Sequence, residues 1–154
     1  MADPVLRFEY PGPQAGGARE DAGRKHFYLF KTDRAVSEVQ IFEKGANNNL
    51  HFHGSEDGVW IVLEGRATFY GEGDKVMAEL GKFQGVLIPA GTKYWFESAG
   101  EEPLQIARVD FQLGEGAQGP RGATGFEVKN SYETSRWSEY ADQEHEAAVA
   151  QRGR

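Results

Sequence analysis

The 154-residue chain contains no cysteine, which excludes disulfide bonds, thiol catalysis and thiolate metal ligands together. It has no apolar run near the roughly 18–20 residues that a membrane-spanning helix needs. Its first residues lack the basic cluster and apolar core of a secretory signal. The sequence therefore predicts a cytoplasmic protein without a membrane partner.

Basic residues are also scarce, with 17 Lys and Arg against 24 Asp and Glu, so the net charge is −7. A surface that binds nucleic acid needs a basic stripe to neutralise phosphates. The nearest group of basic residues lies between positions 19 and 34, where acidic residues interrupt it. We therefore expect no nucleic acid as a partner.

Glycine and proline divide the chain into four segments. Residues 1–25 are rich in Pro, Gly and Ala, which predicts a flexible N-terminal arm with one edge strand at residues 5–10. Residues 26–113 form the barrel domain, and residues 114–130 are a Gly-rich linker. A weak apolar stripe at helical spacing predicts a short C-terminal helix and tail over residues 131–154.

Nine short runs of aromatic and β-branched residues, each closed by a turn signal, predict nine strands in the second segment. The runs are residues 26–31, 36–44, 50–53, 59–63, 66–70, 76–80, 85–89, 94–98 and 104–113. No separator is long enough for a crossover helix, so the strands must pair mostly antiparallel. This pattern predicts an all-β fold, either a sandwich or a double-sheet jelly roll.

Two of the four histidines, His51 and His53, lie two residues apart in the predicted strand 50–53. Alternate residues of a strand share a face. Both imidazoles therefore point the same way, near enough to hold one metal ion or one substrate. Taken alone, the pair is equally consistent with a structural role.

The run Gly45-x5-His51-x-His53, followed by residues 59–67, resembles the first motif of the cupin superfamily. Residues 83–98, which contain Ile88-Pro89-Ala90-Gly91-Thr92, resemble the second. The resemblance covers residues 36–113 and implies a double-stranded β-helix, or jelly-roll barrel. The cupin fold hosts many unrelated activities, so the function must come from the site residues.

Cupin metal sites resemble a cage of three His and one Glu around Fe, Mn, Ni or Zn. The resemblance aligns Gly58 with the glutamate and Tyr94 with the third histidine, which leaves His51 and His53 as metal ligands. Two imidazoles alone make a weak divalent site. Two carboxylates, Glu56 and Asp57, lie just upstream, and a bulge at Gly58 would turn Asp57 inward as a third ligand. A bound Zn, Fe, Mn or Ni ion and a metal-free site both remain open, and no organic cofactor is expected.

Alternate residues of a strand share a face, so Trp60, two positions after Gly58, and Phe96, two positions after Tyr94, should point into the barrel. There they would wall a pocket, with the Tyr94 hydroxyl as a polar group. The predicted catalytic residues are His51, His53 and Tyr94. The predicted substrate-binding residues are Trp60, Phe96, Gln84 and Asn49.

Imidazole titrates near neutral pH, so the two histidines favour an enzyme that moves protons on a carbonyl-containing metabolite. The expected class is an isomerase or epimerase, a cyclase or a dehydratase, of sugar or natural-product biosynthesis. One alternative is a non-catalytic metabolite-binding cupin. A further alternative is a metal-dependent dioxygenase, which normally needs a carboxylate ligand as well. The partners expected are a small molecule and a second copy of the chain in a homodimer, because small jelly rolls commonly pair their edges.

Overall fold

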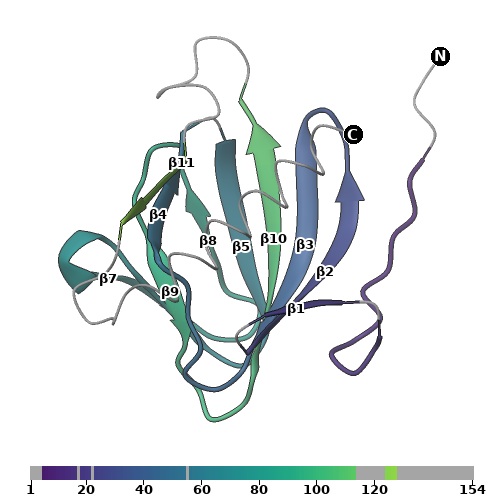
Figure 1. Cartoon of the computed structure of the whole chain (residues 1–154), viewed down its shortest axis with the longest axis horizontal. Helices are drawn as coiled ribbons and strands as arrows, with labels where there is room; N and C mark the ends of the chain where they lie inside the picture. Colours follow the sequence, from purple (N-terminus) through teal and green to yellow (C-terminus); the bar gives the residue numbers. More distant parts are fainter. Residues whose placement is uncertain (1–4, 17, 22, 55, 114–123, 128–154) are drawn as a thin grey trace.

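Two antiparallel layers of strands face one another and enclose the core of the protein (Figure 1). The computed structural model describes residues 5–16, 18–21, 23–54, 56–113 and 124–127. In chain order the elements are β1 (Arg19–Asp21), β2 (Arg24–Lys31), β3 (Ala35–Phe42), β4 (Leu50–His53), β5 (Glu56–Glu64), β6 (Ala67–Tyr70), the 3₁₀ turn η1 (Glu72–Asp74), β7 (Val76–Leu80), β8 (Gly85–Ile88), β9 (Trp95–Ser98), β10 (Leu104–Gln112) and β11 (Thr124–Glu127).

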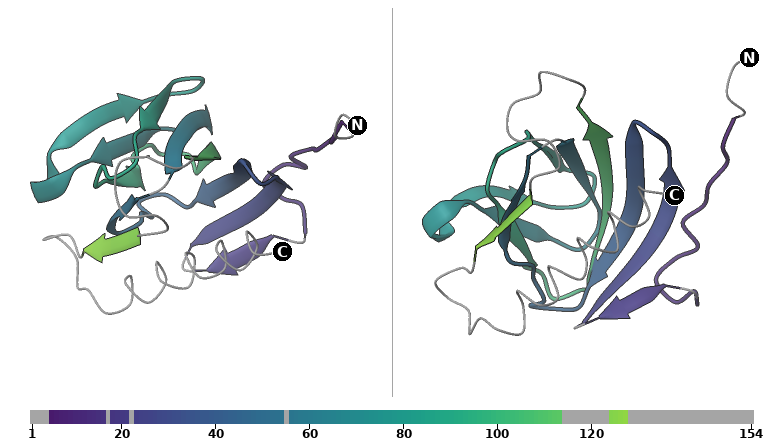
Figure 2. Two further views of the ribbon diagram at one scale, coloured as in Figure 1. Left: turned by 90° about the horizontal axis from the view of Figure 1, so that it is seen from above. Right: turned by 45° about the horizontal axis from the view of Figure 1, so that its top comes forward.

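The larger layer is a six-stranded sheet with the order β1-β2-β3-β10-β5-β8. The opposite layer contains the three-stranded sheet β7-β6-β9 and the strand pair β11-β4. Single bridges from Asn47 to Glu97 and from His51 to Tyr94 join β4 and the residues before it to the β9 region. The two small sheets therefore form one side of the barrel, and Figure 2 shows the two layers from above.

The barrel interior changes from apolar to charged along the paired strands β5 and β10. Their inward residues lie opposite one another in the order Val62–Ile106, Trp60–Arg108, Gly58–Asp110 and Glu56–Gln112. At the first end, Val62 and Ile106 belong to a fully buried cluster that includes three phenylalanines, Phe42, Phe69 and Phe96. At the other end the side chains are charged yet still buried, so each needs a partner inside the barrel. This charged end holds the candidate site.

The predicted all-β jelly-roll fold is confirmed. All nine predicted strands are present, and β4 and β7 have the predicted bounds. The expected strand at residues 5–10 is wrong, because this stretch is irregular and lies on the outer face of the large sheet. There the rings of Phe8 and Phe30 have centroids 5.0 Å apart, and Tyr10 and Phe27 have centroids 5.6 Å apart.

The C-terminal segments differ from expectation where the structure describes them. Residues 124–127, expected to belong to a linker over 114–130, form β11 and pair with all of β4. The glycine-rich residues 114–123 and the helix expected within 131–154 lie outside the described residues. Within the described ranges, no helix has the length and apolar character needed to cross a bilayer.

Candidate active site

Strand β4 presents both histidines to the charged end of the barrel. The ring centroids of His51 and His53 lie 5.0 Å apart, and the Tyr94 ring centroid lies 4.5 Å from that of His51. Backbone hydrogen bonds hold this arrangement. The His51 N–H donates to the Tyr94 carbonyl at 3.0 Å, and the Tyr94 N–H donates to the His51 carbonyl at 2.9 Å. The structure therefore brings together the three residues that the sequence predicts as catalytic.

The tautomer of His51 follows from the partner of its ring. Its Nδ1 lies 2.7 Å from the backbone carbonyl oxygen of Asn49. A carbonyl oxygen only accepts hydrogen bonds, so Nδ1 carries the proton and donates it. In the neutral ring Nε2 then has a lone pair and is a base. The residue is 8% exposed, which leaves it next to solvent but largely desolvated.

His53 lies between the cationic Arg108 and the anionic Glu56. Its Nε2 lies 3.1 Å from Nη2 of Arg108, and because a guanidinium only donates, Nε2 must accept. Its Nδ1 lies 3.0 Å from Oε1 of Glu56, a close electrostatic contact rather than a well-directed hydrogen bond. Both ring nitrogens are thus engaged by protein groups. His53 is held in place by these contacts and has no lone pair left for a substrate.

Arg108 is the central charge of the site. Its Nε donates to Oδ1 of Asp110 at 2.7 Å, and its guanidinium carbon lies 5.0 Å from the centroid of the Trp60 ring. Burial alone would lower the pKa of Arg108, but Asp110, Tyr94, Glu38 and Glu56 outweigh this effect and raise the pKa well above its usual value. The guanidinium is therefore charged under all ordinary conditions.

Sequence reasoning did not assign Glu56, Arg108 or Asp110 to the site. Glu56 has the inward parity of Gly58, two residues further along β5, and is 3% exposed. Asp57, considered as a possible ligand, has the outward parity, and its Oδ1 accepts a hydrogen bond from the Ala90 N–H at 2.9 Å. The missed signal was a pair of charged residues, Arg108 and Asp110, at inward positions of a strand that begins with Leu104 and Ile106.

A narrow crevice, with no room for a water molecule as it stands, lies against these groups. Its lining residues come from the ends of β4, β5 and β8 and from the loop before β9: His53, Glu56, Gly58, Ile88, Pro89, Thr92 and Tyr94. Burial is the main reason that the pKa of Tyr94 lies well above its usual value, so its hydroxyl stays protonated and can donate a hydrogen bond. Imidazole, carboxylate and phenol groups therefore converge on one small space.

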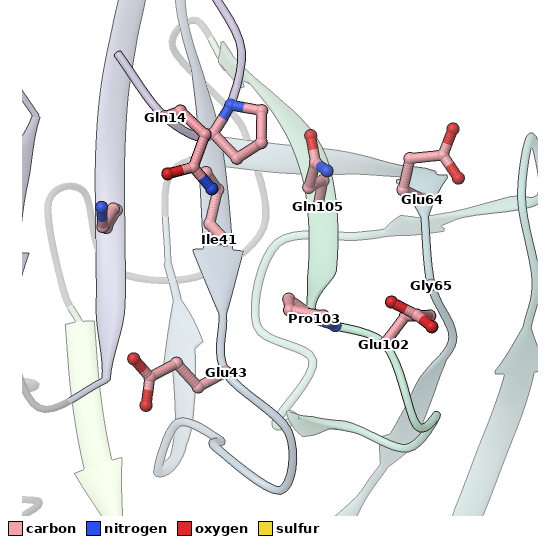
Figure 3. Close-up of a pocket in the computed structure, with 10 residues that line it drawn as sticks. Gln14, Ile41, Glu43, Glu64, Gly65, Glu102, Pro103 and Gln105 are labelled. Atoms are coloured by element: carbon pink, nitrogen blue, oxygen red, sulfur yellow. The ribbon is translucent and has the colours of Figure 1, made fainter. Parts of the chain in front are cut away.

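A separate cleft of about 600 Å³ lies outside the barrel, over the ends of β3, β5 and β10 (Figure 3). The amide side chains of Gln14 and Gln105 line it, and the carboxylate groups of Glu43, Glu64 and Glu102 lie around it. None of its lining residues is a histidine. It therefore lacks the acid–base groups of the interior crevice.

Residues 38–110 match the family model described as the cupin domain. The chain is a cupin-domain protein. The matched segment of this chain begins in β3 and ends in β10. It therefore contains all five residues of the candidate site: His51, His53, Glu56, Tyr94 and Arg108. No curated protein matches the sequence.

Solved structures with the same fold are distant in sequence. The Cnp3 cupin domain of Schizosaccharomyces pombe is 17% identical, with a TM-score of 0.54 over 58% of this chain and 61% of that chain. A double-stranded β-helix protein from Klebsiella pneumoniae, described as uncharacterized, is 19% identical, with a TM-score of 0.57 over 79% and 87%. The capsular polysaccharide assembling protein CapF of Staphylococcus aureus is 18% identical, with a TM-score of 0.60 over 73% of this chain and 34% of that chain. These likenesses show the fold alone.

The predicted substrate-binding residues of this cupin lie in different places. Trp60 and Phe96 are 1% and 0% exposed, and their ring centroids lie 4.9 Å apart in the apolar core. Asn49 is buried next to the histidines, and its backbone carbonyl orients His51. Gln84, predicted to bind substrate, does not lie in the crevice. It is exposed, and its Oε1 accepts a hydrogen bond from the Gly81 N–H at 2.8 Å. This turn joins β7 to β8 and pairs with Val62, at the opposite end of β8 from the crevice.

The residues present do not fit a metal ion held as in the cupin cage. His53 has no free nitrogen, and its Nε2 faces a guanidinium, which would repel a cation. A side chain at Gly58 would start 3.3 Å from Oδ1 of Asp110, so a glutamate at the cage position would require the Asp110 carboxylate to shift. Among the described residues, no three His, Asp or Glu side chains are grouped as a metal site requires.

Proposed function

We propose that the charged end of this cupin barrel is the active site of an enzyme that moves a proton on a small carbonyl-containing metabolite. The reaction class is isomerisation or epimerisation, cyclisation or dehydration. The observation that supports it best is the contact between His51 Nδ1 and the Asn49 carbonyl at 2.7 Å. This contact leaves the second ring nitrogen as a base, as general acid–base catalysis requires.

The neighbouring groups suggest a division of roles. His51 takes the proton from the carbon next to the carbonyl group, and negative charge develops on the carbonyl oxygen. The Tyr94 hydroxyl, kept protonated by burial, donates a hydrogen bond to that oxygen. His51 then returns the proton at the new position or passes it to a leaving group. In this scheme His53 is a positioning residue, because Glu56 and Arg108 already engage its ring.

A non-catalytic binding protein is the second candidate, and the contacts of His53 favour it, because Glu56 and Arg108 engage the two nitrogens of this ring. The crevice as it stands has no room for a water molecule. Trp60 and Phe96 fill the interior beneath it. The crevice must therefore widen when a substrate or ligand enters.

Hydrogen–deuterium exchange separates the two candidates. Small α-hydroxy and α-keto compounds and sugars are incubated with the protein in D₂O, and loss of the proton next to the carbonyl group is followed by NMR. An enzyme of the proposed class should catalyse this exchange, and His51→Gln should slow it by about 100-fold or more. His26→Gln is the matched control, because His26 is also buried but lies on β2 and contacts Glu38 at 3.5 Å, whereas His51 lies on β4 with its ring centroid 4.5 Å from that of Tyr94.

Two results would contradict the catalytic assignment. Exchange that is equally fast in His51→Gln would show that His51 is not the base. Compounds that bind without any exchange in the unmodified protein, detected by saturation transfer from protein to ligand, would favour the binding protein instead.

A further inference from the structure

The guanidinium of Arg108 is surrounded by groups of the kind that bind metal ions. Oδ1 of Asp110 lies 2.7 Å from its Nε, and Nε2 of His53 lies 3.1 Å from its Nη2. Two further carboxylates are slightly more distant, with Glu38 at 3.9 Å and Glu56 at 4.0 Å. One imidazole from β4 and three carboxylates from β3, β5 and β10 therefore face the same cation.

Three carboxylate residues surround the guanidinium inside the barrel. Glu38, Glu56 and Asp110 are each at most 6% exposed, and a guanidinium nitrogen of Arg108 lies within 4.0 Å of each of them. Polar neighbours share the load: the Gln112 amide donates to Glu56 at 2.6 Å, and the Gln40 amide donates to Glu38. Buried carboxylates need a cation close by, so this space requires positive charge.

The position of Gly58 fits the same picture. Asp110 lies opposite Gly58 in the β5–β10 pairing, and its Oδ1 occupies the space that a side chain at position 58 would enter. The glycine thus makes room for the Asp110–Arg108 pair. The absence of a side chain at Gly58 on β5 and the Asp110–Arg108 pair on β10 are two parts of one arrangement.

We infer that Arg108 is a built-in cation that occupies the place of a divalent metal ion in this barrel, so that the protein binds such an ion only when the guanidinium is removed. In the unmodified protein the side chains around Arg108 are not grouped as a metal site, because the guanidinium lies between them. Without it, the imidazole of His53 and the carboxylates of Asp110 and Glu56 would be able to close on one ion. Nitrogen and oxygen ligands of this kind suit Zn²⁺ and Mn²⁺. This inference does not depend on the substrate or on whether the protein is an enzyme.

The test is metal uptake by untagged protein that has been treated with a chelator. Zn²⁺ and Mn²⁺ are added separately, and binding is measured by calorimetry and by elemental analysis after dialysis. The unmodified protein should bind neither ion, whereas Arg108→Ala should bind one ion per chain. Adding His53→Ala to Arg108→Ala should abolish this uptake. Uptake of one ion by the unmodified protein, or no uptake by folded Arg108→Ala, would overturn the inference.

Two control variants separate the position of the charge from the loss of a buried arginine. Arg24→Ala removes a guanidinium that is 2% exposed and lies 5.9 Å from the Phe42 ring centroid, outside the histidine site. It should gain no metal. Arg108→Lys keeps a cation in place and should also bind none. Metal uptake by either variant equal to that of Arg108→Ala would contradict the inference.

A measurement on the unmodified protein covers the case in which Arg108→Ala does not fold. The ring signals of His51 and His53 are observed by ¹H–¹⁵N NMR while Zn²⁺ is added. If Arg108 occupies the metal position, neither ring should shift. A saturable shift of both rings would show that a metal binds beside the guanidinium, and the inference would be wrong.

Discussion

Replacing Arg108 with methionine should destabilise the protein by about 3–5 kcal/mol near neutral pH, the usual cost of removing one partner from a buried charge network. Methionine keeps much of the volume and flexibility of the arginine side chain, so the change mainly removes charge and hydrogen bonds. Asp110 would lose its 2.7 Å contact with Nε, and the buried Glu38 and Glu56 would lose their contacts with the guanidinium. The loss should therefore be as large as that of a typical large-to-small core substitution, although methionine leaves little cavity.

The loss should depend on pH and on Asp110. In acid, carboxyl groups take up protons and no longer need the cation, so the difference in unfolding free energy between the two proteins should shrink. Adding Asp110→Asn to Arg108→Met should recover part of the loss, because the closest buried anion is then neutral. Both effects follow from charge and not from packing.

Urea unfolding followed by tryptophan fluorescence measures these free energies. Trp60 is a suitable probe, because its ring lies 5.0 Å from the guanidinium carbon. A loss below about 1 kcal/mol, which is the range of exposed ion pairs, would refute the buried network. A loss that stays constant from neutral to acidic pH would show that packing rather than charge explains it.

The remaining predictions concern single positions and the assembly. Burial raises the pKa of Tyr94 above its usual value of about 10, so the unfolded chain releases the phenolic proton first and stability falls as the pH rises above 10. Tyr94→Phe should make the fall above pH 10 less steep in urea titrations, and identical slopes would contradict this. Gln84→Ala should leave turnover unchanged in the exchange assay, because Gln84 lies in the exposed β7–β8 turn. A tenfold or greater loss of turnover would show that Gln84 does contribute to the active site. Gly58→Glu should lower the melting temperature in calorimetry without creating a metal site, since its Cβ would lie 3.3 Å from Asp110; a stable variant that binds Zn²⁺ would show the space to be open. We expect light scattering to give twice the chain mass of 17.1 kDa, and a monomer at micromolar concentration would refute the homodimer.

Features that depend on neighbouring residues could be predicted from the sequence. The bounds of β4 and β7 follow from short runs of aliphatic and aromatic residues between turn signals, and both agree with the structure. The common face of His51 and His53 follows from the alternation of side chains along a strand, and their ring centroids lie 5.0 Å apart. The same alternation predicts that Trp60 and Phe96 point inward. It does not distinguish the wall of a pocket from the packed core in which the structure places them, where they are 1% and 0% exposed.

The chemistry of the site was decided by which strands lie opposite one another. Arg108 and His53 are 55 positions apart in the chain and meet only because β10 and β4 belong to facing layers of the barrel. The same packing brings Asp110 to Gly58 and leaves Gln84 in an exposed turn away from the crevice. Local alternation sets the face on which a side chain lies, but the pairing of distant strands sets its partner. Thus the sequence alone predicted the barrel and the two histidines, and only the tertiary structure showed that a guanidinium lies against them.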